Sequence, residues 1–352
     1  MSNDKLAVDH VTDPEVPRIG VWDRREFVKG VAALGSSAAM LRYDLGLAAV
    51  EPPPETTKIR FVHGPWLCYA PQYLAEELLR MEGFTEVEYQ EIEINIPATL
   101  VKTADLGIVG APGLIPVIDS GMPVTTLAGL HNGCWELFGN ERIQTIGDLT
   151  GKSIAVSGIS GPDHVWIASM LAYVGANPQR DVNWVATGRI AESMRLFVEG
   201  KVDAFLGFPP QPQEMRARKI GRVIVNTTLD RPWSQYFCCM VVANREFVSR
   251  NPIATKRALR ALLKAADICA QEPERAARFL VTKGYEPRYE IGLEVLKGLP
   301  YDQWRTADPA DTLRFHALRL HEVGMIKSTP QKIIAQGTDW RFLNELKKEL
   351  KA

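Results

Sequence analysis

Residues Ser157–Trp166, with the sequence SGISGPDHVW, bring small, hydroxyl-bearing and titratable side chains into one short stretch. They follow an apolar run that ends at Val156 and precede the segment IASMLAYVGAN, so the pattern predicts a strand end, a turn and the start of a helix. Three chemistries fit such a stretch: a phosphate-binding loop, an acid–base pair of Asp163 and His164, or a ligand-binding turn at a helix N-terminus.

The two catalytic interpretations lack support. The nearby GKS at residues 151–153 imitates the end of a P-loop, but it leads into a strand and the preceding glycine is out of register. Asp163 and His164 are neighbours, and neighbouring residues on a helix do not face each other. Since no other catalytic motif accompanies them, we expect a protein that is not an enzyme and that holds no cofactor.

No metal site is expected either. His63, His131 and His164 are scattered singly along the chain, while His316 and His321 are five residues apart and do not share a helix face. The ligand-binding turn is therefore the hypothesis that remains for SGISGPDHVW. If Asp163 points into a cleft, the ligand should carry a neutral or cationic group there, whereas an anion is allowed if Asp163 only caps the helix.

The elements that position this turn follow a recurring sequence pattern. Each unit has a β-branched run, then a turn with glycine or proline, and then a helical segment. The pattern occurs in KIRFVHGPW, ADLGIVGAPG, KSIAVSGISGP and VDAFLGFPPQP, and it predicts an α/β protein with mainly parallel sheets. Residues 103–113 and 201–211 resemble each other, because each has an acidic residue before a buried strand, then a glycine and a proline. This repeat predicts two lobes of similar structure.

The predicted domain organisation is a signal peptide at 1–49, a linker at 50–57, the first part of lobe I at 58–142, lobe II at 143–238, and a return strand with C-terminal helices at 239–352. The sequence TIGD, which has the spacing of a capping box, marks the boundary between the lobes. The strand SQYFCCMVVANREF is long enough to leave lobe II, and the helical segments after it should cover lobe I.

The N-terminal segment has the features of a twin-arginine export signal. An arginine pair lies in DRREFVKG at residues 23–30, and the uncharged stretch GVAALGSSAAML follows at residues 30–41. Small residues near Ala49 offer a cleavage site, although Arg42 and Asp44 before it leave open a retained membrane anchor. We expect a periplasmic protein exported by the twin-arginine machinery.

The composition limits the kinds of molecule that the chain is expected to bind. The 352 residues have a net charge of -1 and contain no block of basic residues, so binding to nucleic acid is not expected. No apolar run approaches the roughly 20 residues of a membrane span. The five cysteines leave at least one unpaired, and Cys238 and Cys239 are expected to be buried side chains on opposite faces of a strand. The chain is expected to be a monomer that binds a small molecule.

The order of KIRF, GPW, ADLGIVGAPG, IGDLTGKSIAVSGISGP, KVDAFLGF and NPIATKRALRALLKAADI resembles the substrate-binding proteins of ABC importers for nitrate, sulfonates, taurine and thiamine-pyrimidine precursors, the SsuA/THI5-like or NMT1 family. The likeness covers roughly residues 58–348. It implies a periplasmic-binding-protein fold of type II, in which two α/β lobes close on a ligand like a Venus flytrap. It also implies an ABC permease and its ATPase as partners.

The resemblance and the position of the strand ends together give candidate ligand-binding residues, because ligands of open α/β sheets bind beyond the carboxyl ends of the strands. The candidates are Trp66, Tyr69, Gly110, Ala111, Pro112, Ser157, Gly158, Ser160, Gly161, His164, Phe208, Trp233 and Gln235. The aromatic residues among them would suit a flat ligand.

The sequence thus predicts a solute-binding protein that captures a nitrate, sulfonate, carboxylate or small heterocycle and delivers it to an ABC importer. Two alternatives are a ligand-sensing module for a signalling receptor and an enzyme similar to a fungal pyrimidine synthase. That synthase has a Cys-Cys-Cys-Phe-Cys motif, of which this chain has only FCC at residues 237–239. The enzyme is therefore the least favoured of the three hypotheses.

Overall fold

A computed structural model describes residues 51–64, 66–91 and 96–351 of the chain, without the side chains of residues 96–99. The predicted signal peptide at 1–49 lies outside the described residues. From Pro52 onward the chain forms one compact unit. No helix in the described ranges is both long enough and apolar enough to cross a membrane.

The first of two sheets contains the N-terminal strands and one late strand, in the order β2-β1-β3-β10-β4. Its strands are β1 (Lys58–His63), β2 (Glu86–Glu91), β3 (Leu106–Gly110), β4 (Val124–Asn132) and β10 (Phe237–Asn244). β1 is parallel to β2 and β3, whereas β10 is antiparallel to both β3 and β4. Every residue of β3 and β4 is buried, which agrees with their continuous apolar sequences.

The second sheet has the same kind of order, β7-β6-β8-β5-β9. It consists of β5 (Glu136–Gly139), β6 (Ser153–Val156), β7 (Asn183–Ala186), β8 (Ala204–Gly207) and β9 (Arg222–Asn226). β6 is parallel to β7 and β8, and β5 is the antiparallel strand, paired with β8 and β9. Each sheet therefore has one antiparallel strand in an otherwise parallel arrangement.

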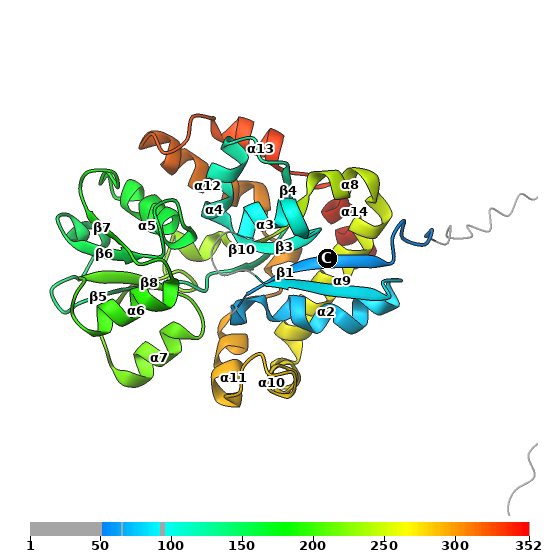
Figure 1. Cartoon of the computed structure of the whole chain (residues 1–352), viewed down its shortest axis with the longest axis horizontal. Helices are drawn as coiled ribbons and strands as arrows, with labels where there is room; N and C mark the ends of the chain where they lie inside the picture. Colours follow the sequence, from blue (N-terminus) through cyan, green and yellow to red (C-terminus); the bar gives the residue numbers. More distant parts are fainter. Residues whose placement is uncertain (1–50, 65, 92–95, 352) are drawn as a thin grey trace, which may run out of the picture. The chain divides into compact units, whose positions relative to one another are not determined.

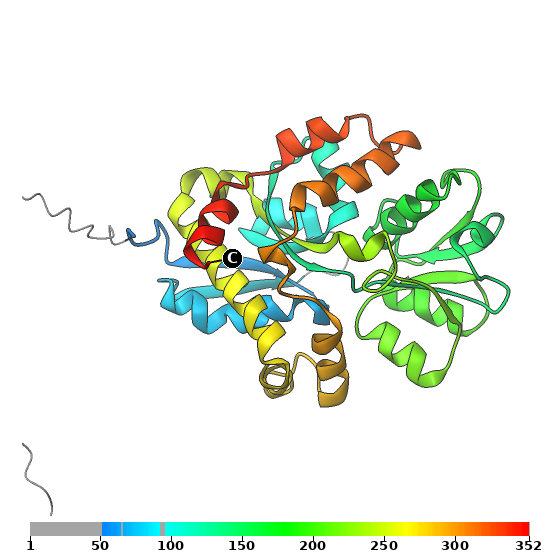
Figure 2. The ribbon, with the colours of Figure 1, turned by 180° about the vertical axis from the view of Figure 1, so that it is seen from behind.

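Helices cover both faces of each sheet, as parallel strands require, and Figures 1 and 2 show the two groups. The first sheet is covered by α2 (Ala70–Met81), α3 (Ile96–Thr103), α4 (Ala111–Asp119), α9 (Pro252–Gln271) and the later helices, namely α10 (Pro273–Thr282), α11 (Tyr289–Gly298), α12 (Pro309–Glu322), α13 (Pro330–Gly337) and α14 (Arg341–Glu349). The second sheet is covered by α5 (Pro162–Tyr173), α6 (Ile190–Val198) and α7 (Gln211–Arg218). The predicted α/β class is confirmed.

Two segments connect the lobes. The chain leaves the first sheet after β4 through residues 133–135, and it returns from β9 to β10 through residues 227–236. Glu136–Gly139, which the predicted boundary assigns to lobe I, pairs within the second sheet. The capping box of TIGD is present, with Thr145 and Asp148 bonding reciprocally, but the crossover precedes it.

The repeated acidic residues have the same structural role in both lobes. Asp105, just before β3, accepts hydrogen bonds from the backbone N–H of Arg60 at 2.8 Å and from its guanidinium group. Asp203, just before β8, accepts hydrogen bonds from the backbone N–H of Ser153 at 2.9 Å and its hydroxyl at 2.8 Å. Each carboxylate therefore ties the entry of one strand to the neighbouring strand, β1 or β6.

Candidate functional site

A cavity of about 340 Å³ lies where the two lobes face each other. It is bounded by the turn after β1, the starts of α4 and α5, the end of β8 and the first crossover. The lining residues are Trp66, Cys68, Tyr69, Val109, Gly110, Gly113, Pro116, Val117, Ser120, Met122, Trp135, Gly158, Ile159, Ser160, Gly161, Pro162, Phe208 and Cys239. The carboxyl ends of the parallel strands thus meet at this cavity, as open α/β sheets require of a ligand site.

Aromatic side chains from both lobes form much of its wall. The ring of Trp66 lies 5.2 Å from that of Tyr69 and 6.2 Å from that of Phe208 across the cleft, measured between ring centroids. Trp135, from the first crossover, meets Phe208 edge to face at 5.3 Å. Such rings offer flat, apolar surfaces on which a planar ligand can stack.

The turn before α5 has the geometry that its sequence predicts. Gly161 is the N-cap and Pro162 the first helical residue, where its missing N–H costs nothing. The N–H of Gly161 bonds to the carbonyl of Gly158 at 2.9 Å, and Ser160 has a positive φ of 68°. An added Cβ at Gly158 would meet no atom within 4 Å, so this residue borders open space.

Asp163 points into the protein and not into the cavity. Its buried carboxylate accepts hydrogen bonds from the N–H of Ser157 and the hydroxyl of Ser157, both at 2.6 Å, and from the N–H of His164 at 3.0 Å. Burial raises the pKa of this carboxyl, and the hydrogen bonds partly oppose that rise. The positive end of α5 therefore already holds an internal negative charge, and the Ser157 hydroxyl is already engaged.

The cavity wall is mostly apolar. Among the described residues that line it there is no Lys, Arg, Asp or Glu, and the hydroxyl groups are those of Ser120, Ser160 and Tyr69. The charged residues lie in an adjoining cavity of about 720 Å³, which shares Trp66 and Phe208 with the first and includes His63, Glu91 and Arg189.

The predicted ligand-binding residues fall into two groups. Those on the cavity wall are Trp66, Tyr69, Gly110, Gly158, Ser160, Gly161 and Phe208, and those outside it are Ala111, Pro112, Ser157, His164, Trp233 and Gln235. Trp233 instead packs against Tyr173 and Phe315. His164 packs against Trp184, and burial lowers its pKa to about 4.

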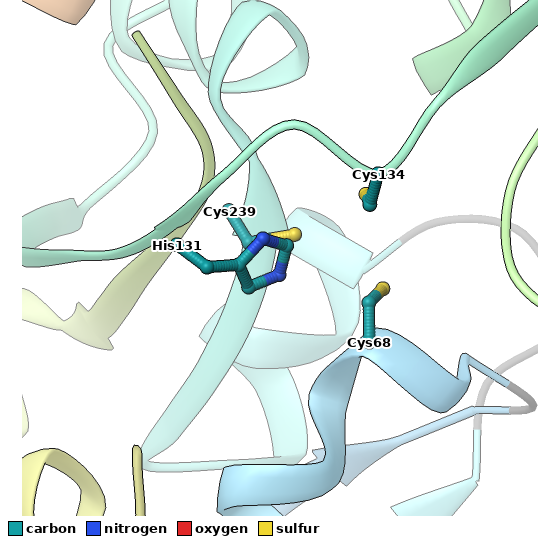
Figure 3. A group of neighbouring side chains, drawn as sticks. All are labelled: Cys68, His131, Cys134 and Cys239. Atoms are coloured by element: carbon teal, nitrogen blue, oxygen red, sulfur yellow. The ribbon is translucent and has the colours of Figure 1, made fainter. Parts of the chain in front are cut away.

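Trp135 and two cysteines, Cys68 and Cys239, also line the cavity and were not predicted. Trp135 lies in the crossover, where no periodic pattern marks it. Cys68 and Cys239 belong to a buried group with His131 and Cys134, whose ligand-type atoms all lie within 4.8 Å of one another (Figure 3). His131 and Cys134 are three residues apart, but Cys68 and Cys239 are distant in the chain, so the sequence shows only half of the group as a local pair.

The electrostatics of this group favour one thiolate. Burial alone raises the pKa of the Cys239 thiol, but the thiol groups of Cys134, Cys238 and Cys68 together lower it well below its usual range. The pKa values of Cys68, Cys134 and Cys238 are raised, first of all by burial. All five cysteines are buried and free of disulfide bonds.

Comparison with known proteins identifies a family whose sequences this chain resembles. A family model described as NMT1/THI5 like matches residues 85–276. Three Saccharomyces cerevisiae proteins, each named 4-amino-5-hydroxymethyl-2-methylpyrimidine phosphate synthase, are 26% identical over 186 residues, which is 49% of this chain and 53% of theirs. The chain thus spans about half the length of the curated relatives that it matches.

Solved structures share the fold at low identity. The periplasmic nitrate-binding protein NrtA from Synechocystis PCC 6803 aligns with a TM-score of 0.70 at 17% identity, over 85% of this chain and 90% of that one. The alkanesulfonate-binding protein SsuA from Xanthomonas axonopodis pv. citri, bound to MOPS, aligns with a TM-score of 0.66 at 16% identity, over 83% of this chain and 100% of that one. The predicted periplasmic-binding-protein fold is confirmed.

The expectation that the chain is not an enzyme is overturned by the curated relatives, which are named as synthases. That expectation rested on the absence of a linear catalytic motif. A linear motif is not required, because the fold brings titratable groups together from separate segments: Cys68 and Cys239 lie at the cavity wall, and the buried His131 lies beside them.

Proposed function

Because this chain belongs to the NMT1/THI5-like family, we propose that it captures a small, flat, uncharged heterocycle of the pyrimidine class in the cavity between its lobes. The observation that carries the proposal is the character of the cavity wall, which is aromatic on both lobes and has no Lys, Arg, Asp or Glu among the described residues that line it. A planar, uncharged heterocycle loses less solvation free energy in such a site than an ion does, and it gains stacking contact.

The start of α5 argues against a small inorganic anion. A helix N-terminus favours an anion through its free N–H groups and its partial positive charge. Here Pro162 has no N–H, the N–H of His164 bonds to Asp163, and the Asp163 carboxylate supplies the negative charge. Nitrate or a sulfonate at this turn would lose its hydration without gaining these partners.

Polar groups remain for orienting a heterocycle. Ser160 lies at the wall, and the buried Trp166 has an indole N–H without a partner among the described residues. This Nε1 atom lies close to Gly110, since a Cβ on Gly110 would be 3.4 Å from it. A ring nitrogen or carbonyl of the ligand that reaches Gly110 would find this donor.

For delivery, we propose that the closed, liganded form docks on an ABC permease whose ATPase drives import in the periplasm. The proteins of similar fold that are named periplasmic binding proteins support this role. Ligand capture shifts the lobes toward the closed form, which distinguishes cargo-loaded from empty protein. The twin-arginine pair at residues 24–25 supports export.

A second candidate function is the synthesis of a pyrimidine phosphate in the same cavity. The names of the curated relatives favour it, and so does the lowered pKa of Cys239, which lines the cavity beside His131. A thiolate is a nucleophile, and an adjacent imidazole can move a proton. Mass spectrometry of the small molecules in solution before and after incubation with the protein separates the two candidates, because a synthase forms a new pyrimidine phosphate, whereas a binding protein forms no new compound.

Thermal unfolding of the purified chain with a ligand panel tests the proposal. The panel is 4-amino-5-hydroxymethyl-2-methylpyrimidine, other pyrimidines, an aromatic carboxylate, taurine, an alkanesulfonate and nitrate. At 100 times its Kd, a ligand specific for the folded state stabilises it by about 2.7 kcal/mol. We expect a rise in Tm with a pyrimidine and none with nitrate, and the opposite pattern would overturn the proposal.

A further inference from the structure

We infer that Cys68, His131, Cys134 and Cys239 form a binding site for a thiophilic metal ion, of which Zn²⁺ is the best match, at the hinge between the lobes. This site is additional to the ligand cavity, whose proposed occupant does not depend on it. The four side chains come from three separate segments and converge on one point (Figure 3).

The distances and burial suit a single ion. The four donor atoms all lie within 4.8 Å of one another, and each residue is buried. A tetrahedral zinc site with Zn–S bonds of about 2.3 Å has sulfur atoms roughly 3.8 Å apart, so the observed group needs only a small contraction. Three thiols and an imidazole are soft donors, which select zinc and related metals over calcium or magnesium.

The state of His131 is an independent observation. Its imidazole is completely buried, and Nε2 has no hydrogen-bond partner among the described residues. Nδ1 lies 3.2 Å from the carbonyl oxygen of Asn132. Donation from Nδ1–H to that carbonyl leaves the lone pair on Nε2, which is the arrangement that orients a metal-bound histidine.

Further neighbours hold the ligands in place. The sulfur of Cys238 lies 2.8 Å from that of Cys134, so an S–H of Cys238 can donate to a Cys134 thiolate. The Tyr301 hydroxyl donates to the carbonyl of Cys68 at 3.1 Å, and the Tyr301 ring packs edge-on against His131. Partners of this kind fix ligand orientation in metal sites.

The position of the group determines how an ion reaches it and which segments the ion would connect. Cys68 and Cys239 line the ligand cavity, so an ion reaches the group from the cleft. Cys134 belongs to the crossover that leaves the first sheet, and its φ of 141° is unusual for a residue other than glycine. Cys239 lies on β10, where the chain returns. A bound ion would therefore join the first connection between the lobes to the strand in which the second connection ends.

The experiment measures metal content of the full chain, purified under reducing conditions and loaded with Zn²⁺ or Co²⁺. We expect about one ion per chain by elemental mass spectrometry, and a Co²⁺ spectrum with thiolate charge-transfer bands and the intense visible bands of tetrahedral coordination. Cys68→Ser and His131→Gln should reduce the content to near zero. Cys269→Ser is the matched control, since Cys269 is equally buried but lies outside the group.

Circular dichroism verifies that each variant folds. The wild-type chain supplies a second measurement that needs no substitution, because removing the ion with a chelator should lower its Tm and restoring Zn²⁺ should recover it. Absence of stoichiometric metal in the reduced, folded wild-type chain would overturn the inference. So would equal metal loss in Cys269→Ser, or a Cys134–Cys238 disulfide that persists under reducing conditions. Failure of pyrimidine binding alone would leave the metal content unchanged.

Discussion

At the scale of single residues, the proposed ligand contact depends on ring faces more than on charge. Phe208 extends from the end of β8 and meets Trp66 and Trp135 across the cleft. Phe208→Leu keeps an apolar side chain but removes the flat surface. Because an aromatic pair contributes about 0.5–1.5 kcal/mol beyond its burial, we expect up to about tenfold weaker pyrimidine binding by calorimetric titration. An unchanged Kd would show that Phe208 is only part of the core.

His316 carries a separate prediction about acid stability. It is fully buried in α12, its Nδ1 atom lies 2.9 Å from the Ser169 hydroxyl, and burial lowers its pKa from 6.5 to about 3. The unfolded chain binds a proton below about pH 6.5 that the folded chain does not. This histidine therefore stabilises the fold fully above pH 6.5, and the contribution falls by up to about 1.4 kcal/mol per pH unit toward pH 3.

Urea unfolding at a series of pH values between 7 and 4 measures this slope. We expect His316→Gln to unfold with a shallower pH dependence than the wild type, because the group that takes up the proton is gone. His321→Gln, an exposed change on the same helix, is the matched control. Equal slopes in all three proteins would contradict the assignment.

Residue-level prediction from the sequence pointed to positions on the cavity wall where a strand end leads directly into a turn, and their role in ligand binding stays a prediction. Gly158, Ser160 and Phe208 were expected at the cleft, and the structure places them on the cavity wall. It failed for Trp135 because a crossover has no periodicity. It failed for Cys68, His131 and Cys134 because only the fold brings their side chains together.

At the scale of elements, each lobe is held by a carboxylate at the entry of a buried strand. Asp203 accepts hydrogen bonds from the N–H and hydroxyl of Ser153 and from the side chain of Asn140. Asp203→Asn replaces one acceptor oxygen with a donor that faces another donor. We expect the free energy of unfolding to fall by about 1–3 kcal/mol in urea titrations.

Asp302→Asn, an exposed change in the other lobe, should leave the unfolding free energy within about 0.5 kcal/mol of the wild type. A loss as small as this in Asp203→Asn would mean that the carboxylate does not anchor β8. The sequence showed the repeated acidic residue, but not its partner strand, because register depends on which strands become neighbours.

At the scale of the whole described unit, ion pairs join the lobes outside the cavity. Arg288, before α11, lies 2.7 Å from Glu214 on α7, and Arg216 on α7 lies 2.7 Å from Glu294 on α11. Exposed pairs of this kind add only about 0–1 kcal/mol to stability. They are placed where hinge opening would separate them, so they bias the lobes toward closure.

The double variant Glu214→Gln with Glu294→Gln removes both pairs. We expect a larger radius of gyration of the ligand-free protein by X-ray scattering, a Tm close to that of the wild type, and recovery of the compact form on ligand binding. An unchanged radius together with a large fall in Tm would assign these pairs to stability instead of closure.

Most of the fold followed from the sequence, because alternating strand and helix patterns allow few arrangements. The repeat of residues 103–113 and 201–211 indicated two lobes. The pairing of β5 with β8 and β9 was not apparent, since the short segment Glu136–Gly139 precedes the capping box that marked the predicted boundary. Asp163 could not be assigned in advance, because a carboxylate in the first turn suits both an inward and an outward position.

The most direct test of the proposed ligand site uses the open space beside Gly158. Gly158 lines the cavity and a Cβ there would meet no atom within 4 Å, so we expect Gly158→Leu to fold and to occupy part of the cavity. A Cβ at Gly298, at the end of α11 and away from the cavity, would also meet no atom within 4 Å, so Gly298→Leu is the matched control. Calorimetric titration with 4-amino-5-hydroxymethyl-2-methylpyrimidine should show binding to the wild type and Gly298→Leu, and at least 100-fold weaker binding, roughly 2.7 kcal/mol, to Gly158→Leu. Equal pyrimidine affinity in all three proteins, or binding of nitrate in its place, would contradict the account.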